Sequence, residues 1–110
     1  MTPRLLVAFP LFLLAVLDAR ALTSREMLEE WCSGGSAAAV GRCFGYLLAA
    51  EDALSAHSLE GVRACLPGDI SLQQQHRILI EWMRAHPEAR SATALGLVAR
   101  AYAESYPCSK

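Results

Sequence analysis

Four cysteines constrain the fold of this chain more than any other feature of its sequence. Cys32, Cys43, Cys65 and Cys108 all follow an N-terminal segment that has the features of an export signal. Exported chains fold where disulfides form and persist, and four cysteines allow three pairings. We expect Cys32–Cys43 and Cys65–Cys108, because the first would join two consecutive helices and the second would tie the C-terminus to the central loop. By the loop-entropy model, the two bonds raise the free energy of unfolding by about 3 and about 4 kcal/mol. This is enough to decide whether so small a domain folds.

The N-terminal segment, residues 1–21, has the three parts of a secretory signal peptide. Arg4 supplies the positive charge, Leu5 to Leu17 is almost entirely apolar, and Ala19-Arg20-Ala21 has the small-x-small form of a cleavage site. A transmembrane anchor is the alternative, but the apolar run is short against the roughly 20 residues that a bilayer requires. We therefore expect cleavage, a periplasmic mature domain of residues 22–110, and no membrane contact afterwards.

The composition fits one small domain without a nucleic-acid partner. The 110 residues are 54% hydrophobic and 19% charged, and 10 Lys and Arg balance 11 Asp and Glu without a basic cluster. Nucleic-acid binding requires a basic surface, so we do not expect it. The cysteine and histidine spacings also lack the CxxC, HxxxH and CxxCH patterns of zinc and haem sites. We expect neither a metal nor another cofactor.

The longest predicted helix runs from Ala37 to Ser55, with Ser36 as its N-cap. It is apolar almost all round, with Gly41 and Gly45 on the side opposite the face that carries Cys43 and Leu47. We expect this helix to be central to the bundle and packed on two faces. Our first interpretation of the second face is contact with another helix of the same chain; a contact with a subunit or partner is the alternative.

A short helix precedes it and a longer one follows. Thr23-x-x-Glu26 fits a capping box for the first, which Gly34-Gly35 ends. Ser71-x-x-Gln74 fits a second capping box, for a helix that ends at Ala85 because His86-Pro87 cannot continue it. His76 falls in the apolar arc of this helix, where we expect a hydrogen-bonded core or interface histidine.

The last predicted helix closes the domain. Its apolar stripe consists of Leu95, Val98, Tyr102 and Tyr106. Arg100 and Glu104 should form a pair on its solvent side. No alternation typical of strands appears, so the fold class is all-α, a small disulfide-stapled bundle of about four helices behind the signal peptide.

Nothing in the sequence predicts an enzyme. Paired cysteines leave no thiol nucleophile for a histidine to activate. Glu51 and Asp52 are neighbours on a helix and point about 100° apart, which does not suit a shared acid–base site. The irregular segment from Ser55 to Asp69 contains a disulfide-tethered turn, Cys65-Leu66-Pro67-Gly68. A binding or inhibitory protein fits better, because a rigid stapled surface needs little ordering on binding.

Several landmarks together resemble one family. They are Cys43-Phe44-Gly45-Tyr46 followed by Asp52, Cys65-Leu66-Pro67 before Ser71-Leu72-Gln73-Gln74, Arg84-Ala85-His86-Pro87-Glu88, and Tyr106-Pro107-Cys108. Their order and spacing resemble the amidase-immunity family of type VI secretion, of the Rap/Tai kind. Where that family often has a second glycine, four residues after Gly45, this chain has Ala49. The resemblance implies a helical periplasmic protein that binds and inhibits a peptidoglycan amidase effector by occluding its groove, commonly as a homodimer.

The partner-binding surface is expected to combine the loop from Ser55 to Arg63 with the polar arc of the third helix. The residues chosen are His57, Ser58, Glu60, Arg63, Arg77, Glu81 and Arg84. They follow by exclusion, because the apolar arcs are needed for the core and the cysteines for the disulfides; ordinary solvated charge is the alternative. From another functional class, a small periplasmic disulfide-bonded helical chaperone or stress protein is the competing interpretation.

Overall fold

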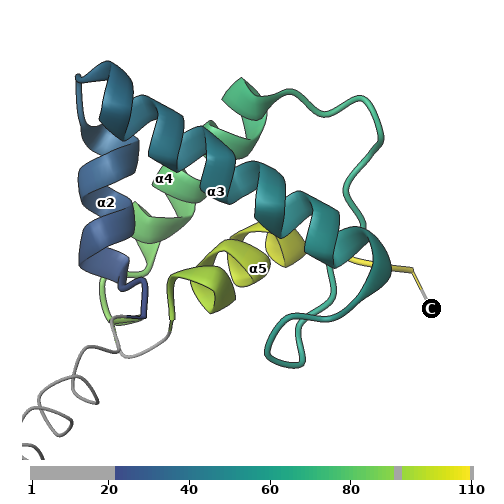
Figure 1. Cartoon of the computed structure of the whole chain (residues 1–110). Helices are drawn as coiled ribbons and strands as arrows, with labels where there is room; N and C mark the ends of the chain where they lie inside the picture. The colour runs from purple at the N-terminus through teal and green to yellow at the C-terminus, as the bar shows by residue number, and fades with distance from the viewer. Residues whose placement is uncertain (1–21, 91–92, 110) are drawn as a thin grey trace, which may run out of the picture.

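The computed structural model describes residues 22–90 and 93–109, and this part of the chain is an all-α bundle of four helices (Figure 1). In chain order the helices are α2 (Arg25–Ser33), α3 (Ala37–Ala56), α4 (Leu72–Ala85) and α5 (Ala94–Ser105). The predicted fold class is confirmed. The predicted signal peptide, residues 1–21, lies outside the described residues. Among the described helices, none combines the length and the apolarity that crossing a membrane requires.

Each helix begins at a serine or threonine whose side chain accepts a hydrogen bond from a backbone N–H of the first turn. These N-caps are Ser24, Ser36, Ser71 and Thr93. The capping box that opens α4 is as predicted, since Gln74 accepts from the Ser71 N–H at 3.1 Å. The capping box predicted at Thr23 is wrong, because the N-cap is Ser24 and the residue three positions after it is Met27, whose side chain cannot accept the reciprocal bond. Thr23 instead accepts the Ala94 N–H at its carbonyl, which ties the entry of α2 to the start of α5.

Two disulfides close the bundle, and both pairings are those expected from the sequence. Cys32–Cys43 joins the end of α2 to α3, and Cys65–Cys108 joins the loop before α4 to the C-terminal segment. The turn inside the first bridge is tight. A Cβ at Gly34 would lie 2.8 Å from both the Ala39 Cβ and the Glu30 carbonyl, so only glycine fits there.

The central helix of the bundle is α5 and not α3, which corrects the prediction. Seven of the 12 residues of α5 are buried, against four of the 20 in α3. Figure 1 shows α3 crossing the front of the molecule, with α2 at one end and α4 and α5 behind and below it. A Cβ at Gly41 or Gly45 would meet nothing within 4 Å, so the intramolecular second face does not exist among the described residues. The apolar character of α3 comes largely from alanine and glycine, which tolerate exposure.

The core lies where α5 meets the other three helices. Its largest fully buried side chains are Tyr102, Leu28, Leu47, Leu79, Leu97 and Gln75. Two details of the predicted last helix are wrong. Tyr106 is the C-cap, outside the helix. Glu104 forms no ion pair with Arg100 among the described contacts; its carboxylate accepts from the Trp82 indole N–H at 2.7 Å and lies 3.5 Å from His86 Nε2.

Candidate partner-binding surface

The first half of the segment between α3 and α4 contains a small hairpin with a two-residue turn. Leu59 and Val62 exchange both backbone hydrogen bonds, each at 2.9 Å. The two residues between them have positive φ, 51° at Glu60 and 77° at Gly61, as a type I′ turn requires. Asparagine or glycine is the usual first residue of such a turn, so a glutamate there is strained. An additional contact must hold it.

That contact is with the start of α5. The Thr93 hydroxyl donates to Glu60 Oε2 at 2.6 Å, while the same oxygen of Thr93 accepts the Gly96 N–H. A Cβ at Gly96 would run into the Glu60 carboxylate, so glycine leaves the space that the carboxylate fills. The positive end of the helix dipole also favours a carboxylate at this position. Glu60, one of the residues predicted to contact the partner, therefore also anchors the hairpin within the chain.

The second half of the segment is anchored at the opposite end of α5. The Cys65 N–H donates to the Tyr106 carbonyl at 2.8 Å, next to the Cys65–Cys108 disulfide. The Ile70 N–H then closes a turn on the Pro67 carbonyl at 3.2 Å. The exposed residues of the segment are His57, Ser58, Glu60, Gly61, Arg63, Cys65, Pro67, Gly68, Asp69 and Ser71. A loop held at both ends yet exposed loses little conformational freedom when it binds.

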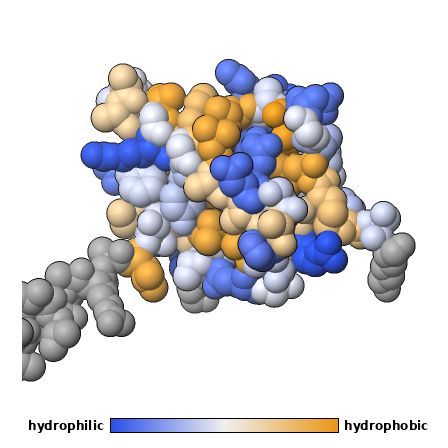
Figure 2. Space-filling model, turned by 45° about the vertical axis from the view of Figure 1, so that its right-hand side comes forward, coloured by the Kyte–Doolittle hydropathy of each residue, from blue (hydrophilic) through white to orange (hydrophobic). Residues whose placement is uncertain are grey.

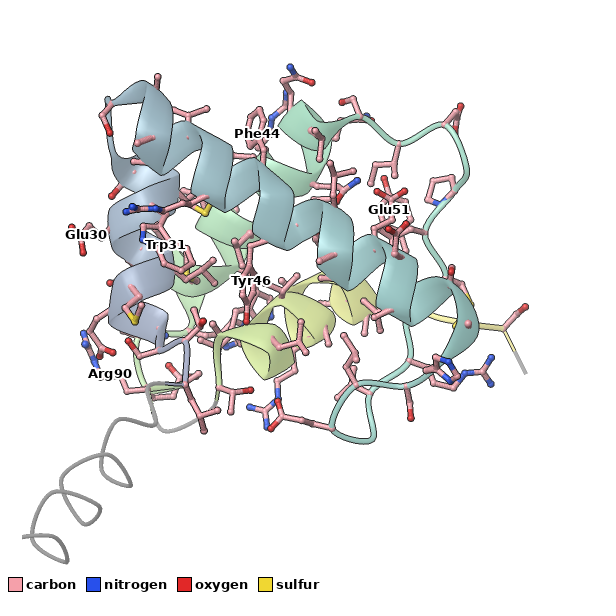
Figure 3. The ribbon with its side chains drawn as sticks, in the orientation of Figure 1. Glu30, Trp31, Phe44, Tyr46, Glu51 and Arg90 are labelled. Carbon is pink, nitrogen blue, oxygen red and sulfur yellow. A yellow bond between two sulfur atoms is a disulfide. The ribbon has the colours of Figure 1, made fainter. Side chains whose placement is uncertain are left out.

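A hollow of about 340 Å³ lies between this loop and the last turns of α3. We call it the Glu51 recess; it is lined by Glu51, Leu54, Ser55, Arg63, Ala64, Cys65, Leu66, Pro67 and Gly68. Figure 3 shows Glu51 projecting from α3 toward the loop. On this side of the molecule apolar and hydrophilic residues are interleaved (Figure 2). The recess thus combines a carboxylate with apolar walls.

Two buried side chains hold the Glu51 carboxylate in place. Gln75, which is fully buried, donates its Nε2–H to Glu51 Oε2 at 2.7 Å, and the buried Tyr102 hydroxyl donates to Gln75 Oε1 at 2.8 Å. A carboxylate only accepts, so the amide must turn its NH₂ toward Glu51. Burial, helped by the Glu51 charge, raises the pKa of Tyr102 well above its ordinary value and keeps the hydroxyl a donor. No pattern in the sequence indicates this network, because a glutamine in a run of three carries no local sign of burial.

The structure does not bring all the predicted partner-binding residues into one hollow. Arg77, Glu81 and Arg84 are exposed on α4, as expected. Arg84 lines a separate hollow, also of about 340 Å³, whose lining includes Arg25. Arg63 lines the Glu51 recess instead. A partner that contacts both groups must therefore cover a broad surface.

Arg25 lines the hollow beside Arg84 but serves the fold. Its side chain is 3% exposed, and its guanidinium donates to the carbonyls of Met83, His86 and Ala89 at 2.7, 2.5 and 3.1 Å. It also pairs with the Glu29 carboxylate at 2.6 Å. These carbonyls lie at and just beyond the end of α4, where helix acceptors need partners.

His76 is half-buried and hydrogen-bonded where α4 meets the end of α2, as predicted for an interface histidine. Its Nε2 lies 2.7 Å from the Cys32 carbonyl at the end of α2, and its ring meets Phe44 edge-on. It therefore links α4 to the first disulfide. All four cysteines are in disulfides. Within residues 22–90 and 93–109, no three metal-binding side chains are grouped together.

The described part of the chain is a small disulfide-bonded helical domain with an exposed loop that is fixed at both ends of α5. The comparison with known families is more specific. A family model described as Rap1a immunity proteins matches residues 12–108, and the chain belongs to this family. Searches of the curated proteins and of the solved structures returned no match. The match spans both disulfides and the loop between α3 and α4, and it indicates an effector-immunity role.

Proposed function

We propose that this protein is a periplasmic immunity protein that binds a peptidoglycan amidase effector of a type VI secretion system and occludes its active-site groove. Membership of the immunity family supports the effector-binding part. The two disulfides fit an oxidising compartment, reached through cleavage of residues 1–21. The observation that carries the proposal is the loop between α3 and α4, because it is exposed and yet fixed at both ends of α5. Such a loop can enter a groove without losing its shape.

The proposed contact surface joins this loop to the exposed side of α4. Its members are His57, Ser58, Glu60, Arg63, Arg77, Glu81 and Arg84. Charged groups at the edge of an interface steer association, and those that become buried must be matched by the partner. The natural test is co-expression with the product of the adjacent gene, which we expect to be a small cysteine-dependent amidase. Co-purification and loss of its peptidoglycan-hydrolysing activity are the expected results.

Charge reversal at Arg77 or Arg84 is expected to weaken amidase binding by a few kcal/mol, because a mispaired interface charge is desolvated without compensation. Gly96→Ala should weaken binding as well, since the new methyl group displaces the Glu60 carboxylate and releases the hairpin. Calorimetry measures the affinity, and circular dichroism verifies that helicity is unchanged. Unchanged affinity in all three variants would mean that another face binds the amidase.

We also propose a homodimer formed through the outer face of α3. Four small residues, Ala37, Gly41, Gly45 and Ala49, are exposed there at intervals of four. Val40 and Leu48, which are 40% and 45% exposed, also lie on the exposed part of this helix. Small residues at this spacing let two helices approach closely, and no helix of the described chain uses the space above the glycines.

Sedimentation at micromolar concentration should therefore give a dimer, and Leu48→Glu should give a monomer with unchanged helicity, because a charge would be buried at the contact. Arg100→Glu on the solvent side of α5 serves as the control and should stay dimeric. A wild-type protein that sediments as a monomer would count against the dimer and leave this face of α3 free.

A further inference from the structure

We propose that the Glu51 recess binds a cationic side chain, lysine or arginine, presented by the partner protein. The inference rests on the proposed function, because the partner is the effector that the immunity protein binds. It adds a site and a chemistry to that function, since neither the loop nor the arc of α4 explains why a carboxylate is held in a hollow. Three parts of the recess support binding of a cation: the carboxylate at its base, its apolar walls and the charge at its rim.

At the base, Glu51 has acceptor capacity that the chain does not use. Its described hydrogen bond is the 2.7 Å bond from Gln75 to Oε2, whereas an ionised carboxylate has about four lone-pair positions. The side chain is partly buried, and among the described residues no ion pair involves it. A cation entering the recess would therefore find an unpaired charge that is partly removed from water.

The carboxylate is also fixed in advance. Gln75 and Tyr102 are both 0% exposed, and each directs one hydrogen bond along the chain Tyr102, Gln75, Glu51. This orientation is retained in the free protein, so binding requires no rearrangement of the acceptor. Preorganised charged acceptors form shorter and stronger hydrogen bonds than mobile neutral ones.

The walls suit the aliphatic part of a long cationic side chain. Leu54, Leu66 and Pro67 line the recess beside Glu51. Lysine and arginine pack their methylene groups along apolar surface while the charged end stays polar. The volume of about 340 Å³ lies at the small end of the range for ligand sites, about 300–1,000 Å³, which fits a side chain better than a whole cofactor.

Arg63 is the cation of the chain that lines the same recess. It is exposed, and it makes no ion pair with Glu51 among the described contacts. Solvent screens an exposed charge strongly, whereas the partly buried carboxylate is screened less. The recess therefore favours a cation at its base. An anion attracted by Arg63 would be repelled by the Glu51 carboxylate.

The first test uses a single-residue probe, N-acetyl-L-arginine N-methylamide, in an NMR titration of the whole protein. We expect saturable shifts of the amides of Leu66 and Gly68. Glu51→Gln should weaken probe binding about tenfold, because a hydrogen bond to a charged group becomes a neutral one. The new amide oxygen still accepts the bond from Gln75, so the fold is retained. Asp52→Asn, which alters the adjacent exposed carboxylate, is the matched control and should leave binding unchanged.

The neutral isostere, the corresponding citrulline derivative, separates charge from shape. Binding of the arginine probe and not of the citrulline probe supports the proposal. Equal binding of the two would overturn it, because the recess would then recognise a planar amide-like group. An arginine affinity that is the same in Glu51→Gln would overturn it as well.

The second test separates this inference from the proposed function. If the amidase binds the wild type, Glu51→Gln should weaken that binding at least about tenfold, and Asp52→Asn should not. Amidase binding that is insensitive to Glu51→Gln overturns the recess and leaves the immunity function intact. If the amidase does not bind at all, the proposed function fails, and the probe titration still decides whether the recess takes a cation.

Discussion

Replacing Arg25 with methionine is expected to lower the free energy of unfolding by about 3–5 kcal/mol, the loss typical of a broken buried charge network. The guanidinium satisfies three backbone carbonyls, those of Met83, His86 and Ala89, at the end of α4 and beyond it. Methionine keeps the apolar length of the side chain but donates no hydrogen bond. The buried Met83 carbonyl would lose this donor, whereas the His86 carbonyl would keep the bond from the Ala89 N–H. One of the hydrogen-bonded links between α2 and α4 would be lost, and the link from His76 to the Cys32 carbonyl would remain. Urea denaturation followed by circular dichroism measures the change.

Arg84→Met is the matched control for this experiment. Arg84 lines the same hollow, but it is exposed, and no hydrogen bond from its side chain is among the described contacts. Its replacement should change the free energy of unfolding by less than about 0.5 kcal/mol, as is usual at the surface. Arg25→Lys should fall between the two, because an ammonium cannot reproduce the planar fork. Equal losses at positions 25 and 84 would show that the carbonyl contacts contribute little.

Replacing both Cys65 and Cys108 with serine is also expected to lower the free energy of unfolding substantially. This disulfide closes a loop with a sequence separation of 43, for which chain entropy gives about 4 kcal/mol. Cys65 is exposed and Cys108 is half-buried, so serine at both positions leaves no large cavity in the core. The measured loss should thus come mainly from loop closure. Calorimetric melting without reductant measures it.

Hydrogen exchange distinguishes a local from a global effect of this change. Amides of the loop that contacts Tyr106, above all the backbone N–H of residue 65, should exchange faster in the double variant, while those of α2 should keep their relative protection. If the free energy of unfolding falls by less than about 1 kcal/mol, the loop is held without the disulfide. The hydrogen bond from residue 65 to Tyr106 and the bond from Thr93 to Glu60 would then be sufficient. The loop would then remain competent to bind under reducing conditions.

Helix starts and disulfides were largely predictable from the sequence, because both depend on information close along the chain or on very few choices. A cap is decided within three residues, as Ser36 and Ser71 show. The predicted N-cap, Thr23, lies one residue before the actual N-cap, Ser24, because either side chain can cap a helix. The hydrogen bond from the Ala94 N–H to the Thr23 carbonyl favours the helix start at Ser24. Four cysteines allowed only three pairings, so a simple preference for consecutive helices was enough.

The candidate site was predictable only in part. The tethered loop was identified from Cys65 and Pro67, which are local signals. The role of Glu60 was not, since its partner Thr93 is 33 positions away. Glu51 and Asp52 were judged unsuited to a shared acid–base site because their side chains diverge. The structure shows that divergence, since Glu51 lines the recess and Asp52 is exposed to solvent. That only Glu51 lines a hollow could not be read from the sequence.

The sequence by itself determined that the described part of the chain forms four capped helices held by two disulfides, because periodicity, caps and cysteine pairing act over short distances or few alternatives. Only the tertiary structure decided that α5 occupies the centre, since apolar content alone does not distinguish a buried helix from one rich in exposed alanine and glycine. It also decided the polar contacts of the interior. Arg25 reaches Met83 across 58 positions and Gln75 reaches Glu51 across 24, and hydrogen bonds between distant segments leave no periodic trace in a single sequence.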